Sequence, residues 1–170
     1  MFKLDYRIVH TEYDDFFGQN GFFQFKCNDY IYGDMYPKEL EEVMDKVSLY
    51  NWFERMNRTI KNLETKKYVA LSDVESYNTW IEFRRKGREL VISLIKAEKK
   101  QNSSDIEFAI DESTAGEWVN QVVDYSQFRQ EIIEKTGEYI KYIVSNDSVK
   151  LDIDKIKRDF DVSIMKYNEV

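Results

Sequence analysis

Five acidic and aromatic residues lie close together in the run NDYIYGDMYPKELEE, and they form the strongest candidate for a binding site. They are Asp29, Tyr30, Tyr32, Asp34 and Tyr36. Tyrosines supply stiff, amphipathic contact area and aspartates pair with Arg or Lys, so this set suits the recognition of a basic protein partner. The alternative is structural: a strand ends here, a helix follows, and the tyrosines pack on the edge of a sheet.

The residues that most often carry out catalysis are scarce. His10 is the only histidine, which excludes multi-histidine metal sites. The strand pattern places it on an inner face, as a partly buried imidazole with hydrogen-bond partners. Cys27 also falls on an inner apolar face, whereas a nucleophilic cysteine needs an electropositive and accessible setting. We expect structural roles for both.

Pairs of acids could in principle contribute to a divalent metal site. They are Asp14-Asp15, Asp111-Glu112, Asp152 with Asp154, and Asp159 with Asp161. None carries the glycine and the terminal glutamate of a calcium loop. A glycine-rich phosphate loop and a nucleophile elbow are also missing from the sequence. The sequence therefore predicts no metal, no cofactor and no catalytic residue.

Length and composition indicate one globular domain over residues 1–170, with 42% apolar and 34% charged residues. A single cysteine cannot form an internal disulfide, which favours a reducing compartment. No apolar run approaches the roughly 18 residues of a membrane helix, and no signal segment precedes the first strand pattern. These features predict a cytoplasmic protein that does not enter membranes.

The net charge of −7 argues against nucleic acid as the partner, because phosphate binding relies on clustered Lys and Arg. It favours a basic protein partner, or it serves solubility alone. Twelve tyrosines are many to bury, since each buried hydroxyl needs a hydrogen-bond partner. Excess tyrosine is typical of recognition surfaces.

Periodicity predicts an α+β fold built on an antiparallel sheet of about six or seven strands. Residues 2–10 alternate with Phe2, Leu4, Tyr6, Ile8 and His10 on one side, and a turn at 18–21 leads to a second strand ending at Cys27. Further strands are expected at 68–71, 77–84, 88–97, 106–110 and 118–122, with Gly87 in a tight turn.

Two helical patterns complete the prediction, and both helices should pack mainly on one face of the sheet. A long amphipathic helix is expected over residues 37–63, because Pro37 suits a first helical turn and acids follow it. A second begins near Ser126 and is interrupted at Gly137. A weaker helical pattern, capped by Asp152, runs through Phe160.

Three short motifs resemble those of small immunity proteins that accompany bacterial polymorphic toxins. The matching residues are Tyr36, Glu39 and Leu40 at a helix start, Trp80 in one strand, and Gly87, Leu90 and Ile92 in the next. The resemblance spans residues 2 to about 122 and carries over no catalytic or toxin-contacting residue. It implies a cytoplasmic bacterial protein that binds and blocks a toxin, with a basic toxin domain as partner.

The first hypothesis is therefore a non-catalytic protein-binding domain, with an immunity protein as its most concrete form. The second is a small-molecule-binding or enzymatic domain whose site is lined by Tyr, Asp and Glu. The third is a structural subunit of a homo-oligomer that buries its aromatics at a symmetric interface. A deep pocket with convergent polar groups would favour the second hypothesis, and a shallow tyrosine-rich face the first.

Overall fold

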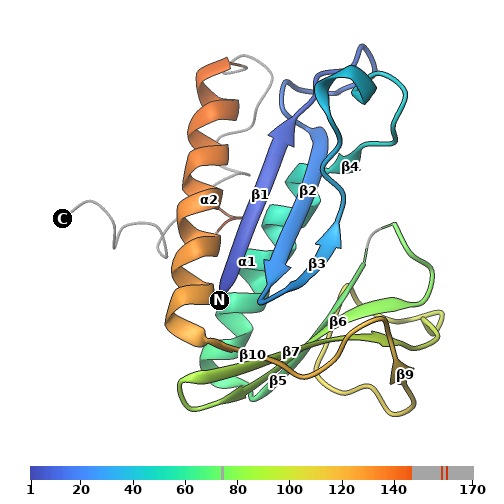
Figure 1. The fold of residues 1–170 in the computed structure, drawn as a ribbon, viewed down its shortest axis with the longest axis vertical. Helices are drawn as coiled ribbons and strands as arrows, with labels where there is room; N and C mark the ends of the chain where they lie inside the picture. Colours follow the sequence, from blue (N-terminus) through green and yellow to red (C-terminus); the bar gives the residue numbers. More distant parts are fainter. Residues whose placement is uncertain (74, 147–157, 159, 161–170) are drawn as a thin grey trace.

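The computed structural model describes residues 1–73, 75–146, 158 and 160, and over these it shows two antiparallel sheets and two long helices (Figure 1). The predicted α+β class is confirmed. The helices stand against the first sheet, and the second sheet crosses below them.

The first sheet contains the predicted amino-terminal hairpin. Its strands are β1 (Phe2–Ile8), β2 (Asn20–Cys27) and β3 (Tyr30–Gly33), and the short β4 (Val47–Ser48) also pairs with β2. Phe2 pairs with Cys27 and Ile8 with Gly21, so the alternating apolar residues of both strands face the core. Strand β1 ends at Ile8, two residues before its predicted end at His10.

The second sheet has the order β10-β7-β6-β5-β8, with β9 also paired to β7. Its strands are β5 (Tyr68–Ser72), β6 (Thr79–Lys86), β7 (Glu89–Lys96), β8 (Ile106–Glu107), β9 (Thr114–Ala115) and β10 (Gln121–Asp124). The predicted β6–β7 hairpin is confirmed, and Gly87 turns with φ 64°. The strand expected at 118–122 begins later, at Gln121, and β9 was not predicted.

One sheet has six strands, as predicted, but the amino-terminal strands form a separate sheet of four. Alternation shows which side chains share a face, but it does not show which strands are neighbours. One edge of β2 is occupied by β1 and the other by β3 and β4. Beyond β1, the Glu131 carboxylate of the second helix accepts the Leu4 N–H at 2.9 Å. A helix therefore meets β1 where a further strand would have extended the sheet.

The helix predicted over residues 37–63 is α1 (Leu49–Thr65), and it begins twelve residues later than expected. Pro37 leads only into the short 3₁₀ turn η1 (Lys38–Leu40). Residues 47–48 pair with β2, and the Ser48 side chain then caps α1 by accepting the Asn51 N–H. The apolar pattern changes phase near Trp52 because the residues before Leu49 are not helical, and the buried stripe of α1 starts at Leu49.

The second predicted helix is α2 (Tyr125–Asn146), which runs unbroken through Gly137. A Cβ built on Gly137 would meet no atom within 4 Å, so this glycine does not accommodate a close neighbour. The helical pattern expected from Asp152 lies outside the described residues, except for Arg158 and the buried Phe160.

One large apolar core joins the two sheets to the two helices. Helix α1 is central to it, since it contacts β2, β5 and α2. Helix α2 covers β1, where Phe128 packs edge-on against Phe2 and Tyr139 against Tyr6. This arrangement places the outer edge of β3, the start of α1 and the end of β5 around one open region of the surface.

Candidate functional site

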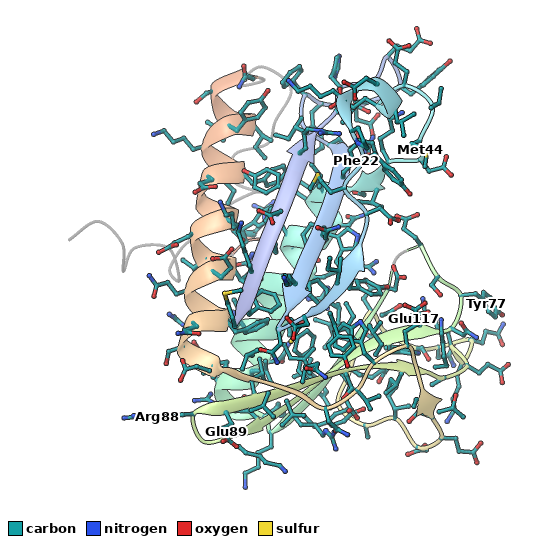
Figure 2. The ribbon with its side chains drawn as sticks, viewed as in Figure 1. Phe22, Met44, Tyr77, Arg88, Glu89 and Glu117 are labelled. Atoms are coloured by element: carbon teal, nitrogen blue, oxygen red, sulfur yellow. The ribbon has the colours of Figure 1, made fainter. Side chains whose placement is uncertain are left out.

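A cleft of about 640 Å³ opens between the two sheets. We call it the acidic cleft, after four carboxylates that line it: Asp34, Asp45, Asp73 and Glu75. Two labelled residues in Figure 2 guide the eye to the cleft: Met44, next to Asp45, at the upper right, and Tyr77, two residues after Glu75, lower on the right. The volume of the cleft lies in the range typical of ligand pockets.

Gly33 allows β3 to reach the cleft. Its φ of 83° lies in the left-handed region that favours glycine, and a Cβ there would come within 2.2 Å of the Phe23 carbonyl oxygen. The chain therefore leaves the sheet after Gly33 and carries Asp34 and Tyr36 along the cleft. Arg7 holds this segment through a hydrogen bond to the Tyr36 carbonyl and an ion pair with Glu41 at 2.7 Å.

Aromatic rings form the inner wall. Trp52, on the first turn of α1, stacks on Phe23 with ring centroids 4.8 Å apart, and Tyr32 meets Trp52 edge-on at 6.3 Å. Trp52 and Phe23 are almost fully buried, whereas Tyr32 and Tyr36 are half-buried. The two tyrosines therefore provide most of the aromatic surface that a ligand could touch.

Asp73 lies at the floor of the cleft and is only 7% exposed. Its carboxylate accepts hydrogen bonds from the Tyr32 hydroxyl and from the Glu75 backbone N–H (2.9 Å). Burial, followed by the charge of Asp73, raises the pKa of Tyr32, so this phenol stays protonated and acts as the donor.

The negative charges of the cleft carboxylates raise the pKa values of their neighbours. Partial removal from water raises the pKa of Glu75, and the negative charges of Asp73 and Asp45 raise it further, while Arg55 lowers it. Partial burial and the nearby Asp34 and Asp45 likewise raise the pKa of Tyr36. Asp45 therefore affects groups on both sides of the cleft.

Few cations offset these charges. Lys46 lines the cleft, and its ammonium group donates to the Glu42 carbonyl oxygen at 3.2 Å. Behind the floor, Lys99 donates to the backbone carbonyls of Asp73 and Ser76. Arg55, also behind it, pairs with the Asp105 carboxylate at 3.2 Å.

The predicted site residues divide into two groups. Asp34 and Tyr36 border the acidic cleft with Tyr32, whereas Asp29 and Tyr30 do not line it and are exposed at the other end of β3. Tyr30 instead packs beside Trp118, with ring centroids 5.9 Å apart. Tyr32 is also tied to the core, because its ring contacts Phe25 and Trp52.

Three carboxylates of the cleft were not predicted: Asp45, Asp73 and Glu75. Asp45 lies just before β4 on the side of the first sheet, whereas Asp73 and Glu75 follow β5 in the second sheet, and the packing of the two sheets brings these two to the cleft. The sequence offers one weak signal, which is that Asp73 and Glu75 directly follow the apolar strand β5.

The tyrosine excess is only partly a surface property. Buried hydroxyls find acceptors, as Tyr139 does at the Gly18 carbonyl (2.9 Å) and Tyr125 at that of Ile60 (3.4 Å). Tyr13 and Tyr77, by contrast, are more than 80% exposed. Composition alone therefore overstated the recognition surface.

The structure agrees with the prediction for Cys27 and differs from that for His10. Cys27 is fully buried as predicted, and burial raises the pKa of its thiol to about 11. His10 is exposed, contrary to prediction, because β1 ends before it. Its ring lies 4.8 Å from that of Phe17, and its Nδ1 lies 3.3 Å from Asp14 Oδ2.

Across the described part of the chain, no three His, Cys, Asp or Glu side chains gather as a metal-binding group. None of the described helices combines the length and apolarity needed to cross a membrane. Comparison with protein-family models, with curated proteins and with solved structures finds no match to this chain.

Proposed function

We propose that this chain is a non-catalytic protein-binding domain and that the acidic cleft receives a basic segment of its partner. The supporting observation is the charge of the cleft, in which four carboxylates face one lining ammonium group. Opposite charges across an interface steer association and fix its register. The same cleft would repel a phosphate backbone, which argues against nucleic acid as the partner.

The half-buried tyrosines suit this role. The Tyr32 side chain is held by its hydrogen bond to Asp73 and the Tyr36 ring packs edge-on against Phe22, so little side-chain entropy is lost when a partner packs against them. Rigid aromatic anchors surrounded by charged groups are typical of protein interfaces.

A second candidate is a domain that binds a small cationic molecule, with or without chemistry on it. The observation that favours it is the concavity of the site, since several carboxylates converge on a cleft large enough for a small ligand. Cys27 is sealed in the core, so its thiol is not accessible to such a molecule. The protein-binding proposal stands first because the cleft also presents the half-buried Tyr32 and Tyr36.

The concrete form of the proposal is an immunity protein that neutralises a bacterial toxin in the cytoplasm. It rests on the resemblance alone, whose residues have structural roles here: Trp80, Leu90 and Ile92 are buried, and Gly87 makes the β6–β7 turn. Its test is to express the product of the neighbouring gene with and without this chain. Rescue of growth by this chain supports the neutraliser, and toxicity unchanged by it contradicts the neutraliser.

The broader proposal can be tested by selecting random twelve-residue peptides displayed on phage against the purified protein. We expect the selected sequences to be enriched in Arg and Lys. The double variant Asp45→Asn/Glu75→Gln should lose that enrichment. The matched variant Asp111→Asn/Glu112→Gln, which removes two exposed charges outside the cleft, should keep it. Selected peptides without basic residues would contradict the proposal.

A further inference from the structure

The charges around the acidic cleft do not balance even when the cations behind it are counted. Four carboxylates line it, whereas Lys46 is the one lining cation and Lys99 approaches Asp73 from behind. Arg55 and Arg7 lie close by, but each already has a carboxylate partner, Asp105 and Glu41 respectively. Two negative charges therefore remain without a counter-charge among the described residues.

These charges are spread over two walls. Asp34 and Asp45 belong to the segments that leave β3 and enter β4, on the side of the first sheet. Asp73 and Glu75 belong to the end of β5, in the second sheet. Because they do not form a metal-binding group, a single small ion cannot contact all of them.

A ligand with one positive charge would leave most of the repulsion in place. Mutual repulsion is evident at Glu75, whose pKa is raised by Asp73 and by Asp45 in addition to its partial burial. A ligand with two separated charges can serve both walls. The rings of Tyr32 and Tyr36, which border the cleft from the first sheet, offer an amphipathic surface for the linking atoms.

We propose that the occupant of the acidic cleft is a protein segment carrying two basic side chains close together, one directed to each wall. This inference rests on the proposed function, because it takes the cleft as the place where the partner binds. The same double positive charge could come from a linear polyamine, and the experiment must separate these two sources.

The test is isothermal titration at low salt with capped tripeptides. Arg-Gly-Arg is compared with Arg-Gly-Gly and Gly-Gly-Arg, with Glu-Gly-Glu as the acidic control and with putrescine, which carries two positive charges, as the polyamine. We expect Arg-Gly-Arg to bind at least about tenfold more tightly than either monobasic peptide. The advantage should shrink to about twofold in Asp45→Asn/Glu75→Gln and persist in Asp111→Asn/Glu112→Gln. Thermal melts confirm that both variants are folded.

Each other outcome decides against the inference in a distinct way. Equal affinity for monobasic and dibasic peptides would overturn it and leave the proposed function standing. Tighter binding of putrescine than of Arg-Gly-Arg would replace the protein segment with a small polycation. If the basic peptides bind no better than Glu-Gly-Glu, both the inference and the assignment of the cleft as the binding site fail.

Discussion

The hydroxyl group of Tyr32 donates a hydrogen bond to the carboxylate of Asp73 and so joins the edge strand of the first sheet to the end of β5 in the second. The two residues are 41 positions apart in the chain. The bond lies beneath the acidic cleft, so the position of one wall relative to the other depends partly on it.

Replacing Tyr32 by Phe should lower the free energy of unfolding by about 1–3 kcal/mol. The ring contacts are kept, but a buried carboxylate loses a donor. Urea denaturation followed by circular dichroism measures the change. Tyr13→Phe, at a side chain that is 85% exposed, is the control and should leave stability unchanged. A Tyr32→Phe protein as stable as the parent would show that the bond contributes nothing.

Glu75→Gln should stabilise the fold at neutral pH while weakening the binding of basic ligands. The native pKa of Glu75 is raised, so its ionisation opposes folding. Below the unfolded pKa the Glu75 carboxyl is neutral in both states and the parent has its full stability. As pH rises through the raised native pKa, ionisation of Glu75 lowers that stability. The gain in Tm from Glu75→Gln should accordingly be present at pH 7 and fade towards pH 4. A gain that does not vary with pH would contradict this explanation.

Two glycine substitutions should have opposite effects. Gly33→Ala combines a positive φ with a Cβ 2.2 Å from a backbone oxygen, so it should destabilise the protein by more than about 2 kcal/mol and distort the cleft. Gly137→Ala adds a Cβ in open space within α2 and should stabilise by about 1 kcal/mol. Thermal and urea unfolding of the two variants, made side by side, provide the comparison. A tolerated Gly33→Ala would show that this turn can relax.

Asp14→Asn should cost about 1 kcal/mol at pH 7, which for this chain length shifts Tm by about 2–4 °C. Burial of the Asp14 carboxylate would raise its pKa, but hydrogen bonds from Thr11 and Asn20 and the nearby His10 outweigh burial and lower it. The parent therefore gains stability above the unfolded carboxyl pKa and loses it as pH falls through the lower native value. Melts from pH 7 to pH 3 should show the two proteins converging. Parallel curves would be inconsistent with a role for the charge.

Local patterns predicted local structure well. The hairpins β1–β2 and β6–β7 follow from alternation and from turn glycines, since their pairs are close in sequence. The start of α1 was wrong because proline and acids also suit a 3₁₀ turn, and the pairing of residues 47–48 with β2 depends on a strand more than twenty residues away. The division into two sheets likewise depends on distant contacts.

The candidate site shows the same limit. Asp34, Tyr32 and Tyr36 could be singled out because three tyrosines and two aspartates gather within one short run. Asp45 and Glu75 could not, because neither has a distinctive neighbourhood in the sequence. Glu75 comes to face Asp34 because α1 packs against strands of both sheets.

The packing of α2 on β1 has a consequence for the order in which the chain folds. Leu4 and Glu131 are separated by 127 positions, whereas the β6–β7 hairpin closes around a single turn. Contacts so distant form late, because the entropy of closing the intervening loop must be overcome first. During synthesis, β1 is made before α2, and the part of its apolar side that α2 covers stays exposed until α2 leaves the ribosome. Because contacts of α2 form late, we expect Ile132→Val to speed unfolding and leave the refolding rate nearly unchanged. Ile81→Val, in the local β6–β7 hairpin, should slow refolding instead.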